Sequence, residues 1–396
     1  MKIFSSSIWQ ISIDQMLKNL TIGSIEVTYP NNEKKNYQGK LPGPKADVTF
    51  HTNNSMKNTI LGGSLGFCES VINGEISSQK MYKIIEIGAS NESGLDTNGK
   101  GYKVFKLLNK LNHFFRNNSI KGAKKNISIH YDLGNDFYSY WLDETMTYSS
   151  AIFKTRNTDL KNAQLNKYDT IAKCIDIKKG QEVLEIGCGW GGFLEFAAKH
   201  YEALVTSITI SKKQYEFTKN KIKQIKLNTN INVLLEDYRN LKGKFDKIVS
   251  IEMFEAVGEN YWPVFFEQIK RLLKPNGAAA LQVITIKDEY FENYRKYPDF
   301  IQKYIFPGGM LPSISSIEKP ISKAGLKLVS IKGFGGDYAN TLAIWRKQFN
   351  KAWPEISKLG FDEKFRRMWN LYLCYCEGGF RAGSIDVNHL KIIPMK

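Results

Sequence analysis

Hydrophobic and polar positions follow two alternating patterns from residue 127 to the end of the sequence. Short apolar runs with the length of buried strands are QEVLEI, ALVTSITIS, INVLLED, KFDKIVSIEMF and GAAALQVITI. Longer segments between them repeat apolar residues every three or four positions, as in SKKQYEFTKNKIKQI and YWPVFFEQIKRLL. This spacing is typical of amphipathic helices. Strands that alternate with helices predict an α/β fold with a doubly wound sheet.

The first 97 residues show a different pattern. β-favouring runs at Ile22–Tyr29 and Lys45–His51 are separated by the polar segment NNEKKNYQGKLPGP. Further along, GGSLGFCESVINGEIS indicates a helix bounded by glycines. Residues 1–97 therefore predict a small α+β domain, and no motif in it resembles a catalytic site.

A basic amphipathic segment, residues 98–126, joins these two regions. No acidic residue occurs from Asn98 to Tyr131, and apolar residues recur at helical spacing, namely Val104, Leu107, Leu108, Leu111, Phe114 and Phe115. Such a helix can lie in an anionic lipid interface, or it can be a linker whose apolar stripe covers a neighbouring domain. The sequence thus predicts three parts: 1–97, 98–126 and a catalytic domain at 127–396.

Composition narrows the class of protein. A chain of 396 residues with 42% hydrophobic residues can bury a large core. No run reaches the roughly 18–20 apolar residues that span a bilayer, and the N-terminus lacks the apolar run of a signal peptide. We therefore expect a cytoplasmic protein. The five cysteines and five histidines have no metal-ligand spacing, so no metal site is expected.

The net charge of +17 implies an anionic partner, either nucleic acid or the surface of an anionic membrane. Charge alone does not choose between these partners.

A glycine-rich loop is the clearest candidate binding site. Gly187-Cys188-Gly189-Trp190-Gly191 follows the apolar run VLEI and precedes a helical pattern. Glycines let the backbone approach a ligand, and the N–H groups of a helix N-terminus attract anionic atoms. Dinucleotide enzymes use similar loops, but they usually place a carboxylate about 20 residues later, where this chain has Ser207–Ser211. Glu236-Asp237-Tyr238 offers a nucleotide contact after the next strand instead.

Several motifs in fixed order identify a family. EIGCGWGG, TISKKQ, EDYR and SIEMFEAVG are accompanied by HYDLGNDFYSYWLDETMTYSSAIF, KYIFPGGMLPS, FGGDYANTLAIW and YLCYCEGGFRA. From His130 almost to the C-terminus the chain resembles the cyclopropane-fatty-acyl-phospholipid synthase family, which includes the mycolic acid cyclopropane synthases. The resemblance implies a Rossmann-like class I methyltransferase fold that uses S-adenosylmethionine. It also implies a small N-terminal domain that handles lipid.

The resemblance assigns residues to the site. Those implied around S-adenosylmethionine are Tyr148, Ser149, Gly187, Cys188, Gly189, Trp190, Gly191, Thr209, Ile210, Gln214, Asp237 and Tyr238. A bound bicarbonate is implied as the base, and the implied catalytic positions are Glu255, Tyr338, Cys376, Ser150 and Gln282.

Two of these positions depart from the family pattern. The family's usual Tyr-Ser-Cys is Tyr148-Ser149-Ser150 here, and Gln282 stands where a histidine is common. Both replacements can hydrogen-bond a small anion, but glutamine does not titrate near neutral pH. The alternative is therefore an enzyme that forms a methyl- or methylene-branched acyl chain and does not close the ring.

The expected function is transfer of one carbon from S-adenosylmethionine to the double bond of an unsaturated phospholipid acyl chain, giving a cyclopropane. The expected partners are membrane phospholipids, an anionic membrane surface that binds the protein peripherally, and a second copy in a homodimer. A nucleic-acid methyltransferase is disfavoured because no N-P-P-Y-type segment is present. A non-catalytic lipid carrier is disfavoured by the intact glycine loop, Glu255 and Tyr338.

Overall fold

The computed structural model describes residues 7–91, 133–227 and 229–395, which form two compact units. Unit 1 comprises the described residues of Met1–Phe115, Asn293–Ile305 and Leu342–Ser384. Unit 2 comprises those of Arg116–Glu292, Phe306–Thr341 and Ile385–Lys396. The segment 98–126 and the domain boundaries expected beside it lie outside the described residues, so they stay predictions. The sequence pattern did not indicate that two later segments would join the N-terminal residues in unit 1.

Unit 1 contains a four-stranded sheet with the order β2-β1-β3-β4. Its strands are β1 (Ile22–Thr28), β2 (Lys34–Gln38), β3 (Leu41–Phe50) and β4 (Ile76–Ser77). β1 is antiparallel to β2, with Ile25 opposite Tyr37, and parallel to β3. β4 is antiparallel to β3. The two β-favouring runs of the sequence thus correspond to β1 and β3, and Val27 of β1 is fully buried.

The described residues of unit 1 also form helices, which come from distant parts of the sequence. They are α1 (Ile8–Lys18), α2 (Asn53–Ile72), α3 (Met81–Ser90), the part of α13 (Gly335–Ile356) from Leu342 onward, and α14 (Glu363–Ala382), with short helical turns at Ile301–Ile305 and Ser357–Leu359. α14 contacts α3 so closely that a Cβ at Gly378 would stand 2.7 Å from the Cβ of Ile85. Only a glycine fits at this helix contact without movement of α3.

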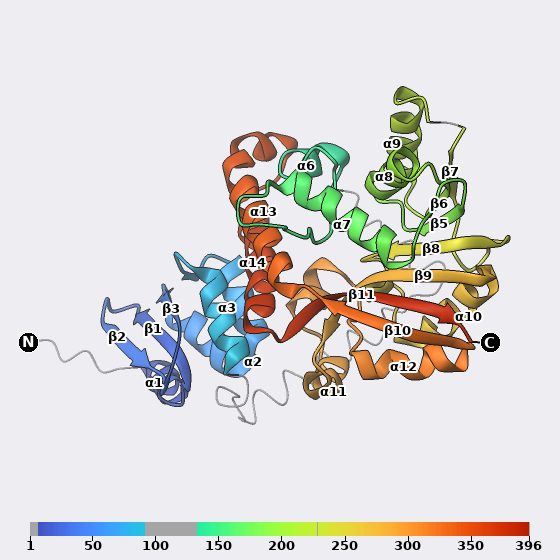
Figure 1. Ribbon diagram of the computed structural model, residues 1–396. Helices are drawn as coiled ribbons and strands as arrows, with labels where there is room; N and C mark the ends of the chain where they lie inside the picture. The colour runs from blue at the N-terminus through green and yellow to red at the C-terminus, as the bar shows by residue number, and fades with distance from the viewer. Residues whose placement is uncertain (1–6, 92–132, 228, 396) are drawn as a thin grey trace, which may run out of the picture. The chain divides into compact units, whose positions relative to one another are not determined.

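Unit 2 contains a seven-stranded sheet with the order β10-β11-β9-β8-β5-β6-β7 (Figure 1). Its strands are β5 (Glu182–Ile186), β6 (Leu204–Thr209), β7 (Ile231–Leu235), β8 (Phe245–Ile251), β9 (Leu273–Ile286), β10 (Leu326–Gly333) and β11 (Ile385–Pro394). The neighbours from β9 to β7 are all parallel, whereas β11 is antiparallel to both β9 and β10.

Helices cover this sheet on both faces. They are α6 (Asn135–Ser139), α7 (Leu160–Cys174), α8 (Gly192–His200), α9 (Lys212–Gln224), α10 (Trp262–Leu272), α11 (Asp288–Lys296, in this unit to Glu292) and α12 (Ile314–Lys323), with turns at Phe254–Ala256 and Glu259–Tyr261. Residues of α7, α8 and α9 form one core cluster with Val183 and Val249 of the sheet. Leu184 and Ile248 point to the opposite face and are also fully buried. The doubly wound α/β fold predicted from the sequence is therefore confirmed.

The strand order places a binding edge in unit 2. β5 lies between β6, which follows it in the chain, and β8, so the chain winds in opposite directions on the two sides of β5. In open α/β sheets, ligands bind beyond the carboxyl ends of the strands at such a switch point. Among the described residues, no helix is both long and apolar enough to cross a bilayer.

The α3–α14 contact gives the first prediction. Gly378→Ala should lower the free energy of unfolding of unit 1 by about 1–3 kcal/mol because the new methyl group overpacks the helix contact. Gly88→Ala is the matched control, since its new Cβ on α3 meets no described atom within 4 Å. Alanine should stabilise that helix by up to about 1 kcal/mol. Urea unfolding followed by circular dichroism should separate the two variants, and equal midpoints would contradict the close contact.

Candidate active site

The glycine loop follows β5 at the carboxyl edge of the unit 2 sheet. Gly187, Gly189 and Gly191 all have positive φ angles, of 97°, 49° and 79°. A Cβ at Gly187 would press on the Met253 side chain at 3.2 Å, whereas one at Gly189 would meet no described atom within 4 Å. The loop is thus packed on one side and open at Gly189. Together with the N-terminus of α8, it can receive the anionic end of a nucleoside cofactor.

Aromatic rings pack beside this loop. Tyr138 lies 4.8 Å from Trp190 and 5.4 Å from Tyr148, measured between ring centroids. Trp190 Nε1 donates to Asn135 Oδ1 at 2.9 Å, and the Cys188 side chain is buried below the loop. Tyr148 and Trp190, both expected at the cofactor, are therefore brought together by residues of α6.

The ends of β6 and β7 hold the remaining residues expected at the cofactor. The Thr209 hydroxyl donates to Gln214 Oε1 at 3.0 Å, and Ile210 lies between them in the chain, half-buried. After β7, Asp237 accepts from Arg239 Nε at 2.8 Å and from Arg239 Nη2 at 2.6 Å. The Asp237 carboxylate is therefore already paired. The Tyr238 ring packs edge-on against Phe265 of α10.

A fully buried lysine, Lys167 of α7, lies behind the segment that contains Ser149. Its ammonium group donates to Ser149 Oγ at 2.7 Å and lies 4.2 Å from the centroid of the Tyr168 ring. Burial lowers the pKa of Lys167 to about 7, against the opposing pull of Glu252 and other carboxylates. Glu185 of β5 is buried as well, and burial raises its pKa to about 7 although it accepts a hydrogen bond from Ser207.

Three hydrogen-bond donors converge on one carboxylate, that of Glu252, directly after β8. The backbone N–H of Ser150 donates to Oε1 at 2.8 Å, and the Gln282 amide donates to the same oxygen at 2.7 Å. The Tyr338 hydroxyl donates to Oε2 at 2.6 Å. Ser150, Gln282 and Tyr338, which the sequence analysis expected at the catalytic site, are therefore brought together. They surround Glu252, which the sequence analysis did not expect there.

His389 of β11 supports Gln282 from behind. Its Nε2 lies 2.9 Å from Gln282 Oε1, on the strand that pairs with β9. Because the amide nitrogen of Gln282 faces Glu252, its oxygen accepts from His389. Burial lowers the pKa of His389 to about 3, so the imidazole is neutral and fixes the orientation of the amide.

Glu255 lies in the turn after Glu252 but does not share its donors. Its Oε1 accepts from the backbone N–H of Ile284 at 2.5 Å, and its Oε2 is buried without a partner among the described residues. Burial, and then the charge of Glu252, raise the pKa of Glu255 to about 8. The two carboxylates thus occupy one edge of the sheet in different surroundings. The catalytic role expected for Glu255 stays a prediction.

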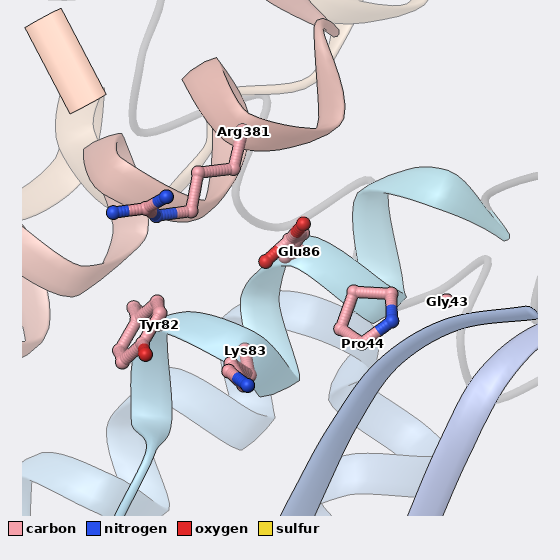
Figure 2. A pocket seen from close by; sticks show the side chains of 6 residues that line it. All are labelled: Gly43, Pro44, Tyr82, Lys83, Glu86 and Arg381. Carbon is pink, nitrogen blue, oxygen red and sulfur yellow. The ribbon is translucent and has the colours of Figure 1, made fainter. Parts of the chain in front are cut away.

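Cys376 is on α14 in unit 1, so its expected role also stays a prediction. Unit 1 contains a separate pocket, which Figure 2 shows; its lining is Gly43, Pro44, Tyr82, Lys83, Glu86 and Arg381. The Arg381 guanidinium is already bound by Glu377 at 3.0 Å and lies 5.4 Å from the Tyr82 ring centroid. None of the residues expected at the catalytic site lines this pocket.

Four buried or hydrogen-bonded residues beside the candidate site were not singled out by sequence reasoning: Glu252, Lys167, Glu185 and His389. Glu252 had one signal, because it is the first residue after a buried strand at the switch point. A buried lysine within a polar helix pattern and a histidine within β11, which lies between β10 and β9, gave no such signal.

Comparisons with known proteins show which family the sequence matches. The family model described as mycolic acid cyclopropane synthetase matches residues 118–390. Cyclopropane-fatty-acyl-phospholipid synthase of Escherichia coli is 35% identical over 352 residues, which are 86% of this chain and 86% of that protein. Tuberculostearic acid methyltransferase UfaA1 of Mycobacterium tuberculosis is 36% identical over 343 residues, covering 84% of this chain and 79% of that protein.

Solved structures show the same fold. Cyclopropane synthase MmaA2 from Mycobacterium tuberculosis matches with a TM-score of 0.64 and 30% identity, covering 68% of this chain and 97% of that one. Mycolic acid cyclopropane synthase CmaA1, complexed with SAH and CTAB, matches with a TM-score of 0.62 and 31% identity over the same shares of the two chains. The class I methyltransferase fold expected from the sequence is confirmed.

The surroundings of Glu255 give a prediction on stability and pH. A raised pKa means that the folded protein holds a proton that the unfolded chain releases above about pH 4.3. Stability from this group is therefore present at low pH and is lost as the pH rises toward about 8. Glu255→Gln should remove this loss, so the variant should gain stability relative to wild type between pH 5 and about pH 8. Urea midpoints across that range measure it, and a constant difference between the two proteins would refute it.

Proposed function

The chain belongs to the mycolic acid cyclopropane synthetase family and is an S-adenosylmethionine-dependent methyltransferase, and on this premise we propose that it modifies the double bond of an unsaturated phospholipid acyl chain. The product that we propose is a cyclopropane. One observation carries the proposal: the glycine loop and the Glu252–Tyr338 cluster share the carboxyl edge of one sheet. The similarity to a phospholipid-modifying synthase over 86% of both chains supports the acyl substrate.

The cofactor, when bound, supplies an electrophilic methyl group. The chain's own contribution starts with the open backbone at Gly189 and with Gln214, which bind and orient it. The rings of Tyr138, Tyr148 and Trp190 lie beside the loop, where they exclude water and face positive charge with their π electrons. A carboxylate in the same edge accepts the proton that the product must lose.

A second product is favoured by a specific observation. Gln282 cannot exchange a proton near neutral pH, and His389 behind it is neutral. One similar protein is named as a tuberculostearic acid methyltransferase. A methylene- or methyl-branched acyl chain is therefore the second candidate, with the same cofactor and the same first chemical step.

We also propose that the protein acts peripherally on a membrane from the cytoplasmic side, and that it forms a homodimer. The support for membrane association is the net charge of +17 together with a lipid substrate. The dimer rests on the family resemblance alone.

Product analysis tests the proposed reaction. Incubation with S-adenosylmethionine and liposomes of mono-unsaturated phospholipid should add one methylene mass to the acyl chains. Proton NMR should show loss of the olefinic signals and new upfield ring protons. The same mass gain without ring protons would establish the branched product instead. No mass gain on any phospholipid would reject the proposed acyl substrate.

Ionic strength tests the membrane proposal. Raising the salt concentration should weaken binding to liposomes that contain an anionic lipid, because the surface charges are screened beyond about 10 Å at 0.1 M salt. Liposomes made only of zwitterionic lipid serve as the control and should bind weakly at every salt concentration. Sedimentation with the liposomes measures the bound fraction. Equal binding to both lipid compositions would contradict an electrostatic attachment.

A further inference from the structure

The Glu252 carboxylate lies at the carboxyl edge of the sheet and accepts hydrogen bonds from three donors, as a bound anion would. Its oxygens accept from Ser150 N–H at 2.8 Å, from the Gln282 amide at 2.7 Å and from the Tyr338 hydroxyl at 2.6 Å. Donor–acceptor distances of this length are typical of hydrogen bonds to an ionised group. The three donors come from a loop, a strand and a helix.

A bicarbonate, which the family resemblance implies as the base, does not fit this arrangement. Ser150, Gln282 and Tyr338 are among the positions expected to hold it, and they already serve a carboxylate of similar shape and charge. A second anion there would meet the charge of Glu252 in a region of low dielectric, where like charges repel strongly.

We propose that the Glu252 carboxylate is itself the base of the reaction, an inference that rests on the proposed function. A side chain of this protein thereby takes the role of base that the family resemblance gives to bicarbonate.

The position of Glu252 suits this role. Glu252 is intermediate in exposure and lies directly after β8, at the edge of the sheet that also holds the glycine loop. The side chain of the neighbouring Met253 packs against Gly187, so that a Cβ added there would lie 3.2 Å from it. Ser250 Oγ donates to Ile186 O at 3.0 Å. Met253 therefore contacts the loop that is expected to hold the methyl donor, and Ser250 contacts the strand residue directly before that loop.

The carboxylate retains one place for a proton. Each carboxylate oxygen has two lone pairs. Both lone pairs of Oε1 are used, by Ser150 and Gln282, whereas among the described residues Oε2 accepts from Tyr338 alone. The remaining lone pair on Oε2 is the proton acceptor.

The surroundings of Glu252 raise its pKa above the ordinary value of a glutamate. Burial raises its pKa, while its hydrogen bonds and the buried ammonium of Lys167 lower it. Glu255 faces it as a second carboxyl group, and neutral His389 adds no charge behind Gln282. A raised pKa makes the carboxylate a stronger base than an exposed glutamate.

The proposed step conserves atoms and charge. The π electrons of the acyl double bond form the new bond to the methyl carbon, and the electrons of the carbon–sulfur bond remain on sulfur. Glu252 then removes one proton from the transferred methyl group of the cationic chain, and the electron pair of that C–H bond closes the ring. Protonated Glu252 releases its proton to solvent before the next turnover. Loss of the same methyl proton after a hydride shift would give the methylene-branched product.

The test uses Glu252→Gly, because Glu252 has a φ angle of 49°, a conformation that glycine adopts freely. In bicarbonate-free buffer this variant should lose turnover about 100-fold or more, the usual contribution of a positioned base. Added formate or bicarbonate should restore much of the rate in the variant by filling the vacated donors. Wild-type turnover should not change when bicarbonate is removed.

Glu202→Gly is the matched control. Glu202 also has a φ angle of 49°, but it precedes β6 at the other edge of the sheet and pairs with Lys179 on the surface. This variant should keep wild-type turnover and should not respond to formate. Full activity of Glu252→Gly without added anion, or a wild-type requirement for bicarbonate, would overturn the proposal.

A binding measurement separates this inference from the proposed function. The resonance of carbon-13-labelled bicarbonate should broaden with Glu252→Gly and stay sharp with wild type and Glu202→Gly. Broadening by wild type to the same extent as by Glu252→Gly would overturn the inference even if no phospholipid is modified. Wild type that binds S-adenosylmethionine but adds no carbon to any phospholipid would reject the proposed substrate, and the NMR result would still decide the place of Glu252.

Discussion

The parallel pairing of β5 with β8 is the constraint on which the site depends. Because the two strands run the same way, the glycine loop after β5 and Glu252 after β8 emerge at one edge of the sheet. β9 continues the same direction beyond β8 and brings Gln282 level with Ile251. A register shift of one residue would turn Gln282 to the other face of the sheet and remove it from Glu252. The chemistry of this protein is therefore set first by backbone geometry.

Buried charge is the second constraint, and one buried lysine faces two of the three buried glutamates beside the candidate site. Glu252, Glu255 and Glu185 would each be costly to ionise in a dry interior. Lys167 is the buried cation that faces Glu252 and Glu185 from α7, and its pKa falls toward neutrality as theirs rise. The charge state of Lys167 and that of Glu252 therefore depend on each other.

Much of unit 2 could be predicted from the sequence, because local patterns encode it. The apolar runs gave strands β5 to β9, and the glycines gave the loop at Gly187–Gly191. The Glu252 cluster could not be predicted in this way, since Ser150 and Glu252 are 102 residues apart and meet only after folding. The segment SIEMFEAVG contains two glutamates, and the family resemblance pointed to Glu255. Only the structure shows that Glu252 is the one that accepts the hydrogen bond from Tyr338. The pairing of Asp237 with Arg239, two residues later, was not part of the prediction either.

The last strand of the chain has a consequence for synthesis on the ribosome. β11 lies between β9 and β10, so the catalytic sheet stays open until Ile385–Pro394 has emerged. Unit 1 is also incomplete until late in synthesis, because its helix α3 contacts α14, which is translated just before β11. Apolar surface in both units is thus exposed while most of the chain is already made, a state in which aggregation competes with folding. Translation that stalls before Ile385–Pro394 has emerged would leave both units unfinished.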